Sequence, residues 1–382
     1  MRHHFSMRSR RQGGTSVAEV ERDPFLDAAR RVLDQFPIQS VAVSLLARAE
    51  NITFKVADDS GNLYTLRLHR PAYHTLEELQ SERLWTKALL QAQIHVPQPI
   101  NTRDGRDYAS VDIPLLGERR HASLSRWVPG EPLMPLIRDD TPREWLELHF
   151  QRLGALIATM NNQAARWHPP AQFRRHALDA DGLMGVQPFW GRFWERSDVS
   201  AGERALLVET RTRLHERLVR YGKDASRYSV IHADLHPGNV LVSGDTLTAI
   251  DFDDVAWGWH MYDLAAALNQ CQEFAEFGAL YAACVAGYRN VRPVAEEDLA
   301  MLPLFLLVRG MAEIGWFADR PENATPAELT AMKSFVIGQC RSFLDGRLSV
   351  PVAASQADVG HERQQLLSQQ VRRGSPIRRG GS

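Results

Sequence analysis

One short strand-forming segment interrupts a C-terminal half whose residue pattern is otherwise mostly helical. From Ser229 to Asp254 the pattern is strand, tight loop, strand (Asn239 to Val242), Ser-Gly-Asp turn and strand (Thr246 to Asp251). Residues 230–263 contain six Asp and no Lys, Arg or Glu. Carboxylates that converge at strand ends repel one another unless a cation neutralises them. The folded segment therefore needs a divalent cation or a cationic ligand.

The oxygen-bearing side chains of this segment have the spacing of a metal site. Asp234 and Asn239 flank a His-Pro-Gly loop, and Asp251 lies at the end of the following hairpin. Asp and Asn supply the hard oxygen ligands that Mg²⁺ prefers, so we expect these three side chains to face one point. A zinc pair of His232 and His236 is excluded, because this loop is not a helix and no third ligand of that type follows.

Composition excludes several classes of protein. The 382 residues, 44% of them hydrophobic, suffice for two or three folding units with buried cores. A formal net charge of −1 provides no global field for binding nucleic acid or an anionic membrane. Three widely spaced cysteines argue against a disulfide framework. The most apolar run, Leu302 to Val308, is much shorter than the ~20 residues of a membrane span. We expect a cytoplasmic protein without nucleic-acid or membrane partners.

The N-terminal third has the pattern of a small sheet with helices. Its strand-forming runs are bounded by clusters of turn-forming residues, and its helices begin at capping residues. Its expected elements are a helix opened by Asp23 and Pro24, strands at 52–57 and 63–69, a helix from the Thr75–Glu78 capping box to about Gln93, and strands near 108–113 and 122–128. The breakers at 129–132 then end this region.

The remainder is predicted to be mainly helical. Its expected helices begin at a capping box of Thr141 to Glu144, span 259–289 and 296–318, and end with one capped by Thr325 that runs to about Leu344. We therefore predict an α+β protein of two lobes. The predicted divisions are a disordered basic arm at 1–20, an N-terminal lobe at 21–129, a C-terminal lobe at 130–348 and a disordered tail at 349–382.

The acidic segment resembles the aminoglycoside phosphotransferase and choline kinase group, whose hallmark is H-x-D-x-x-x-x-N, a hairpin and a further aspartate. Here these residues are His232, Asp234, Asn239 and Asp251. The resemblance implies a protein-kinase-like fold in which Asp234 is the catalytic base and Asn239 and Asp251 hold Mg²⁺ on the phosphates of ATP. It also implies that Asp263 braces the catalytic loop, and we interpret His232 as structural support.

The resemblance extends over about residues 40–320. It implies a phosphate-covering turn at 50–54 with Asn51 and Thr53, and a hinge at Trp127 and Val128 that meets adenine. Arg67 occupies the position of the phosphate-pairing lysine and Glu82 that of its helix partner. The runs at 50–54 and 66–75 are most similar to stress response kinase A and type II homoserine kinases.

Two departures from the family pattern affect the nucleotide site. No glycine occurs between Leu46 and Val56, so the side chains of Asn51 or Thr53 would have to help the backbone hold phosphate. Arg67 replaces Lys, which keeps the charge but changes the geometry. Taken alone, Arg67 fits a solvent-exposed charge on a strand, and Glu82 fits a surface residue of a helix. Taken together, the two residues favour a buried ion pair.

The sequence predicts an ATP- and Mg²⁺-dependent phosphotransferase acting on the hydroxyl of a small, amine-bearing acceptor such as an amino alcohol, an amino sugar or homoserine. Alternatives are a serine/threonine protein kinase of the stress response kinase A type and a nucleotide-binding pseudokinase with a regulatory role. Asp253 and Asp254 fit a substrate amine, a second Mg²⁺ or an exposed turn. The aromatic cluster Phe189, Trp190, Phe193 and Trp194 fits an ammonium group or, preferably, packing between helices. Oligomeric state is left open.

Overall fold

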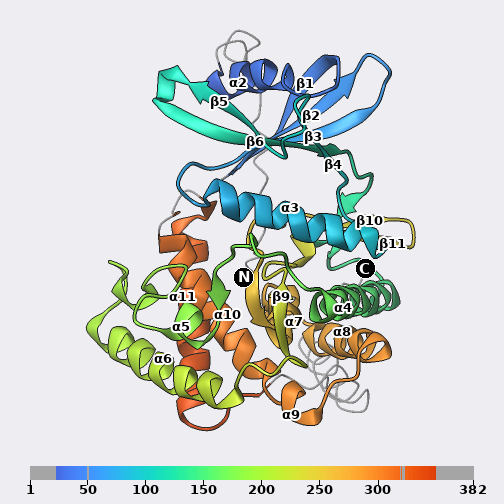
Figure 1. Ribbon diagram of the computed structural model, residues 1–382. Coiled ribbons are helices and arrows are strands. Elements are labelled where there is room, and N and C mark those ends of the chain that lie inside the picture. Colours follow the sequence, from blue (N-terminus) through green and yellow to red (C-terminus); the bar gives the residue numbers. More distant parts are fainter. Residues whose placement is uncertain (1–22, 50, 319, 321–322, 350–382) are drawn as a thin grey trace, which may run out of the picture.

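The computed structural model describes residues 23–349, except for residues 50, 319 and 321–322. The predicted basic arm, residues 1–20, lies outside the described residues, as do residues 350–382 of the predicted tail. In Figure 1 a sheet with one covering helix lies above a larger, mainly helical part. The predicted α+β architecture is present.

The upper sheet has six strands in the order β1-β2-β3-β6-β4, with β5 paired to β6, and all its pairings are antiparallel. Its elements are α2 (Pro24–Leu33), β1 (Ser40–Arg48), β2 (Ile52–Asp58), β3 (Leu63–Leu68), β4 (Pro99–Ile100), β5 (Ala109–Ile113) and β6 (Glu118–Arg126). The alternation predicted for β2 and β3 is correct, since every second residue is buried and Thr53 and Arg67 lie on the other face. Strand β1 was not predicted, because its side chains are almost all exposed and show no alternation.

The larger part consists of helices and two three-stranded sheets, ordered β11-β10-β7 and β8-β12-β9. Its helices are α4 (Arg143–Arg166), α5 (Ala180–Met184), α6 (Ala201–Tyr221), α7 (His260–Asn269), α8 (Phe277–Val291), α9 (Glu296–Leu299), α10 (Leu302–Ala318) and α11 (Pro326–Leu344). Its strands are β7 (Glu131–Pro132), β8 (Ala177–Leu178), β9 (Tyr228–Ile231), β10 (Val240–Ser243), β11 (Thr246–Ala249) and β12 (Ala256–Trp259). The single helix expected over 259–289 is thus two helices, α7 and α8.

The helix-start predictions have mixed outcomes. Thr75 and Thr325 both form the predicted reciprocal capping boxes. The capping box expected at Thr141 is wrong, because α4 begins one residue later than that box requires, with Pro142 as its N-cap. The Thr141 hydroxyl instead donates to the Leu136 carbonyl, 2.8 Å away.

Helix α3 (Leu76–Gln91) lies between the upper sheet and the helices (Figure 1) but shares the core of the helical part. Trp85 and Leu89 are fully buried in that core, and Trp85 Nε1 donates to Gln163 Oε1 of α4 at 3.0 Å. The upper sheet and α2 have a separate core. The predicted lobe boundary at 129/130 would assign α3 to the N-terminal lobe, whereas its apolar contacts hold it to the other part.

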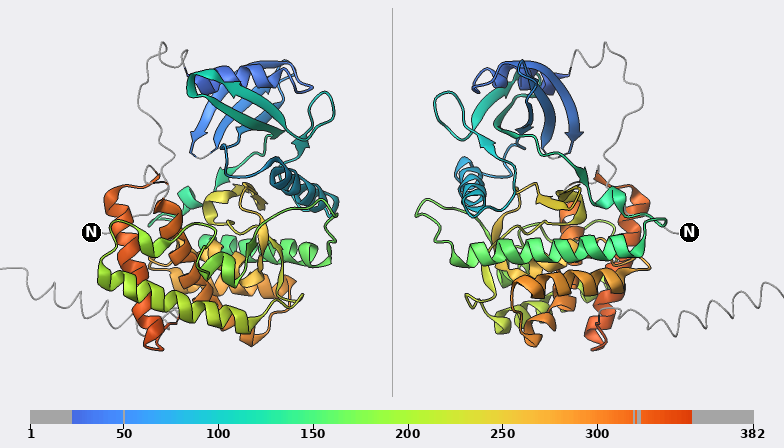
Figure 2. Two further views of the ribbon diagram at one scale, coloured as in Figure 1. Left: turned by 60° about the vertical axis from the view of Figure 1, so that its left-hand side comes forward. Right: turned by 90° about the vertical axis from the view of Figure 1, so that its right-hand side faces the viewer.

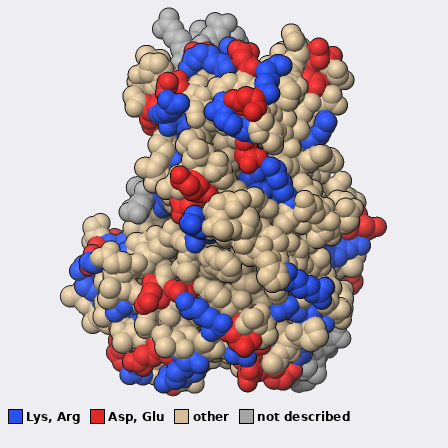
Figure 3. Space-filling view, in the orientation of Figure 1, with Lys and Arg blue, Asp and Glu red and all other residues tan. Residues whose placement is uncertain are grey.

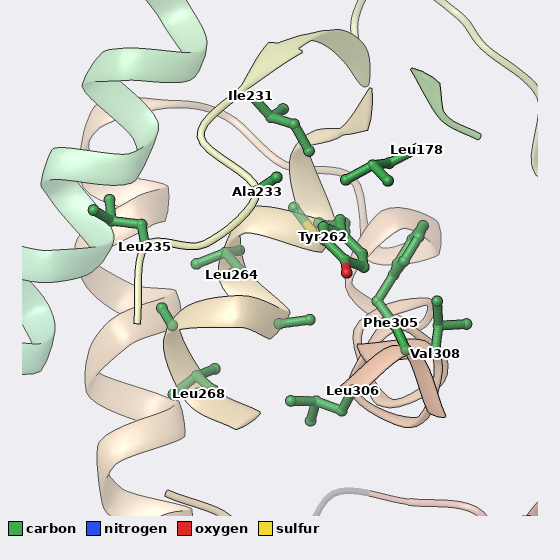
Figure 4. Packing of buried hydrophobic residues seen from close by; sticks show 14 of the residues in the cluster. Leu178, Ile231, Ala233, Leu235, Tyr262, Leu264, Leu268, Phe305, Leu306 and Val308 are labelled. Atoms are coloured by element: carbon green, nitrogen blue, oxygen red, sulfur yellow. The ribbon is translucent and has the colours of Figure 1, made fainter. Parts of the chain in front are cut away.

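Helix α10 is the central apolar helix of the larger part. Residues Glu296–Ala318 are long and apolar enough to cross a membrane, but 67% of their most apolar window is buried inside the protein, as in a core helix. Figure 4 shows Phe305 and Val308 of this helix close to Tyr262 of α7. The same core includes Ala233 and Leu235 of the loop between β9 and β10, so this loop lies directly on buried helices.

Candidate active site

The loop after β9 carries Asp234 and is held by buried polar contacts. Ala233 has a left-handed backbone, with φ of 67°, which costs about 1 kcal/mol or more for a non-glycine residue. Its N–H donates to Asp263 Oδ1 at 2.8 Å, and Asn161 Nδ2 of α4 donates to Asp263 Oδ2 at 2.9 Å. Burial raises the pKa of Asp263 to about 6, against the effect of these hydrogen bonds. Asp263 is therefore placed where the bracing role requires it.

His232 is fully buried and both of its ring nitrogens are engaged. Nε2 lies 3.1 Å from the Ile250 carbonyl, and Asp234 N–H donates to Nδ1 at 3.4 Å. Burial lowers the pKa of His232 to about 4, so the ring is neutral at pH 7. These contacts connect the loop to the residue before Asp251 and support the structural interpretation of His232.

The Asp234 carboxylate is contacted on both oxygens. Asn239 Nδ2 donates to Oδ2 at 3.0 Å, and Arg309 Nη2 of α10 donates to Oδ1 at 2.5 Å. Burial favours the neutral form, but the charges of His236 and Arg309 outweigh it and lower the pKa of Asp234. Asp234 is thus held as a carboxylate.

Asp251 and Arg67 bring the two parts of the molecule together. Arg67 Nη1 on β3 lies 3.0 Å from Asp251 Oδ1, and Asp251 has a left-handed backbone with φ of 64°. The Ile250 N–H donates to the Asn239 carbonyl at 2.9 Å, which joins the hairpin to the Asp234 loop. The four side chains Asp234, Asn239, Asp251 and Arg67 therefore gather where the upper sheet meets the helical part.

The ion pair expected between Arg67 and Glu82 is not formed, because Asp251 takes the guanidinium of Arg67 instead. Glu82 is half-buried on α3, its Oε2 is buried without a hydrogen-bond partner, and desolvation raises its pKa. The sequence predicts both residues at the site, and this assignment stays a prediction. It could not show that a carboxylate 184 positions away from Arg67 lies nearer than Glu82.

Asn51 lies directly before β2, and Thr53 is the second residue of that strand. Asn51 Nδ2 donates to Asp253 Oδ2 at 3.1 Å, and Asn51 Oδ1 accepts from the Arg70 N–H at 2.9 Å. Thr53 is the cross-strand partner of Arg67. The Asn51 side chain thus connects the start of β2 to the segment after Asp251.

The predicted hinge residues Trp127 and Val128 follow β6 and are half-buried. The Trp127 N–H donates to the Leu63 carbonyl at 3.0 Å, and Lys55 Nζ lies 4.6 Å from the centroid of the Trp127 ring. The peptide chain between the two parts is therefore tied to the upper sheet.

Asp253 and Asp254 are not an exposed turn. Asp253 is 8% exposed, and although burial opposes ionisation, contact with His69 and the charge of Arg67 lower its pKa well below the usual range. Asp254 Oδ1 accepts from the Tyr73 hydroxyl at 2.7 Å. Burial and the nearby charge of Asp234 raise the pKa of Asp254 to about 7. Asp254 thus lies beside Tyr73 and within the electrostatic reach of Asp234.

The residues present fit a divalent cation. Asn239 Nδ2 is committed to Asp234, so Asn239 Oδ1 is the atom that can bind a metal, and Asp253 Oδ1 is buried without a hydrogen-bond partner. Within the described part of the chain, no cluster of three or more His, Cys, Asp or Glu has metal-binding geometry. A single amide and one or two carboxylates match a magnesium ion whose other ligands are waters and phosphate oxygens.

Sequence reasoning did not identify Arg309 or Tyr73 as site residues. Arg309 is the only charged residue between Leu302 and Ala312, and a charge inside an apolar helix requires a buried partner. That signal was available, but the identity of the partner was not. The aromatic residues Trp190 and Phe193 are buried, as the packing interpretation predicts.

Comparison with known proteins gives the family. Residues 42–297 match the phosphotransferase enzyme family, APH. The chain belongs to this family. The structure of a microcompartment-associated aminopropanol kinase is 31% identical, has a TM-score of 0.72, and covers 84% of this chain and 98% of that chain. An amicoumacin kinase solved with AMP-PNP and Ca²⁺ has a TM-score of 0.71 at 20% identity, covering 88% of this chain and 98% of that chain, and supports the fold. The predicted resemblance and kinase-like fold are confirmed.

Curated relatives of the family match over part of their length. The homoserine kinase of Agrobacterium fabrum is 33% identical over 249 residues, covering 62% of this chain and 67% of the relative. The amicoumacin kinase of Bacillus subtilis is 24% identical over 228 residues, covering 59% and 62%. The chain thus spans about two thirds of the length of these kinases.

Proposed function

We propose that this phosphotransferase moves the γ-phosphoryl group of ATP to a hydroxyl group of a small, amine-bearing acceptor. The observation that carries the proposal is two side-chain contacts joined through the hairpin: Asn239 is bonded to Asp234, Arg67 pairs with Asp251, and the Ile250 N–H donates to the Asn239 carbonyl. Phosphoryl transfer needs positioning and charge neutralisation more than covalent chemistry, and these four groups supply both.

Each residue has one role in the proposed reaction. Asp234 accepts the proton of the acceptor hydroxyl. Arg67 pairs with the phosphates of ATP, which replace Asp251 as the partner of its guanidinium group. Asn239 and Asp251 would hold Mg²⁺, which when bound neutralises phosphate charge. Asn51 and Thr53 line the phosphates, and the chain at Trp127 and Val128 meets the adenine.

The amine preference rests on the surroundings of Asp254. This carboxyl group lies near Asp234 and is bonded to Tyr73, and the Trp190 indole N–H lies 3.4 Å from the Tyr73 hydroxyl oxygen. A carboxyl group beside an aromatic side chain is suited to an ammonium group, which would neutralise it. The names of the related kinases, aminopropanol kinase and homoserine kinase, denote amine-bearing alcohols.

We further propose that the protein acts in the cytoplasm without nucleic-acid or membrane partners. On the face shown in Figure 3, basic and acidic side chains are interspersed rather than gathered by sign. This agrees with the net charge of −1, which provides no attraction for polyanions.

The test is an ADP-release assay with ATP and Mg²⁺ over amino alcohols, homoserine, amino sugars and generic protein substrates. We expect turnover with one of the small amines. Asp234→Asn should lower turnover about 10²- to 10⁴-fold while ATP still binds. Asp245→Asn is the matched control, because this side chain is 91% exposed in the hairpin turn, and it should leave turnover unchanged.

The same assay distinguishes the alternatives. Turnover only with proteins would favour a serine/threonine protein kinase, and ATP binding without turnover would favour a pseudokinase. Asp254→Asn tests the amine preference: it should lower kcat/KM for the amine but not for a matched alcohol without the amine. An equal loss for both acceptors would contradict the role of Asp254.

A further inference from the structure

Arg309 is a buried cation that contacts two consecutive residues of the Asp234 loop. It is 7% exposed and lies in the middle of α10. Its Nη2 donates to Asp234 Oδ1 at 2.5 Å, and its Nη1 donates to the Ala233 carbonyl at 3.2 Å. One rigid guanidinium therefore holds both the side chain of Asp234 and the peptide group before it.

We propose that Arg309 is a positioning residue for the transfer reaction: it sets the rotation of the Asp234 carboxylate that receives the acceptor proton. This inference rests on the proposed function. Without a donor on Oδ1, the contacts left to the carboxylate would both be on Oδ2, from Asn239 Nδ2 at 3.0 Å and His236 Nε2 at 3.6 Å, and the group could turn about its Cβ–Cγ bond. Ala233, whose backbone is left-handed, would also lose the hydrogen bond on its carbonyl and keep the one from its N–H to Asp263.

The guanidinium is itself held by groups on three helices. Arg309 Nε donates to Glu313 Oε1 at 3.1 Å, one turn further along α10. Glu313 Oε2 accepts from Asn269 Nδ2 of α7 at 2.8 Å. Asn269 Oδ1 accepts from Gln272 Nε2, and Gln272 Oε1 accepts from Gln339 Nε2 of α11, each at 2.8 Å. This chain of polar contacts fixes Arg309 on packed helices, which places Asp234 more precisely than a loop alone can.

The contacts of Arg309 argue against a role as a receptor for an acidic group of the acceptor. All three of its nitrogens donate to protein oxygens, and two of the acceptors are the carboxylates of Asp234 and Glu313. The Trp190 ring, with its centroid 5.6 Å from the guanidinium carbon, covers it further. Its charge is therefore already balanced inside the protein.

The test is a double-mutant cycle with Asp234, using the full-length protein and the acceptor identified above. Arg309→Met should lower kcat about 10- to 100-fold with KM for ATP nearly unchanged, because a small misplacement of a catalytic group has this effect. Arg309→Lys should retain part of the activity. In an Asp234→Asn background, Arg309→Met should cause little further loss, since its effect acts through that carboxylate.

Three results would overturn the inference: wild-type kcat in Arg309→Met, the same fold-loss with and without Asp234, or a rise in KM for ATP that accounts for the whole effect. Arg152→Met is the matched control, because Arg152 pairs with the exposed Asp245, and it should leave kcat unchanged. If Arg309→Met does not fold, Glu313→Gln takes its place and should lower kcat a few-fold at constant KM; an unchanged kcat would contradict the inference.

A crystal structure of the Arg309→Met variant gives a readout that does not depend on turnover. We expect the Asp234 carboxylate to be rotated or to occupy two orientations, and an unmoved carboxylate would overturn the inference. If the wild-type protein turns over no acceptor, the proposed function fails, while this structural comparison still decides whether Arg309 orients Asp234.

Discussion

A single added methyl group at Gly287 should separate two helices that support the site. Gly287 lies on α8 where this helix packs on α4, and a Cβ there would lie 1.8 Å from the Gln151 carbonyl oxygen. Cβ atoms essentially never approach closer than 3.0 Å, so the helices would have to move apart by about 1.2 Å. Figure 2 shows α4 and α8 side by side along most of their length.

The expected loss of stability in Gly287→Ala follows from two opposing effects. Overpacking a tight contact costs about 1–3 kcal/mol, and the upper end applies because the obstructing atoms are backbone. Replacing Gly by Ala within a helix contributes about 1 kcal/mol in the other direction. We therefore expect the free energy of unfolding to fall by about 2 kcal/mol.

The same displacement should reach the active site. Tyr288 of α8 donates to Asn161 Oδ1 of α4 at 3.0 Å, and Asn161 in turn donates to Asp263, which holds the Asp234 loop. Moving α8 away from α4 breaks the first of these contacts. Gly287→Ala should therefore lower kcat as well as stability, although it lies outside the site.

The assay compares urea unfolding, followed by tryptophan fluorescence, for Gly287→Ala and Gly338→Ala. Gly338 lies within α11, and a Cβ there would meet no atom within 4 Å. The same substitution should thus stabilise the protein by about 1 kcal/mol at Gly338 and destabilise it at Gly287. Equal effects at the two positions, or a stabilised Gly287→Ala, would refute the reasoning from close helix packing.

Three further outcomes are expected at the site. Asp251→Ala should abolish the Mg²⁺-dependent part of the protection that ATP gives in a thermal melt, whereas the exposed Asp245→Ala should not; retained protection would mean that another residue holds the metal. Arg67→Met should weaken ATP binding by about 10- to 100-fold in calorimetry, as expected for a lost charge-assisted contact, and unchanged affinity would remove Arg67 from the phosphate site. Because burial raises the pKa of Asp263 to about 6 from its ordinary 3.8, its contribution to stability is full below about pH 4 and is lost as the pH rises through about 6. Urea midpoints should therefore show the wild type losing stability relative to Asp263→Asn between about pH 4 and pH 7, and a constant difference would contradict this shift.

Much of the local structure was predictable because it depends on neighbours in the chain. The capping boxes at Thr75 and Thr325, the alternation of β2 and β3, and the hairpin after Asn239 each follow from side chains a few positions apart. The exposed strand β1 lacked such a signal. The spacing of Asp234, Asn239 and Asp251 indicated one site for the same reason, since a short loop and a tight hairpin leave little freedom in where the three side chains lie.

Partners in buried ion pairs were decided only by how distant segments pack. Arg67 contacts Asp251 rather than Glu82, and Arg309 contacts Asp234 across 75 positions. A residue pattern shows that a buried charge needs an opposite charge, but several carboxylates could serve. The choice depends on which helices and strands meet in the folded core, because contact over a few ångströms is a property of the packing and not of the local chain.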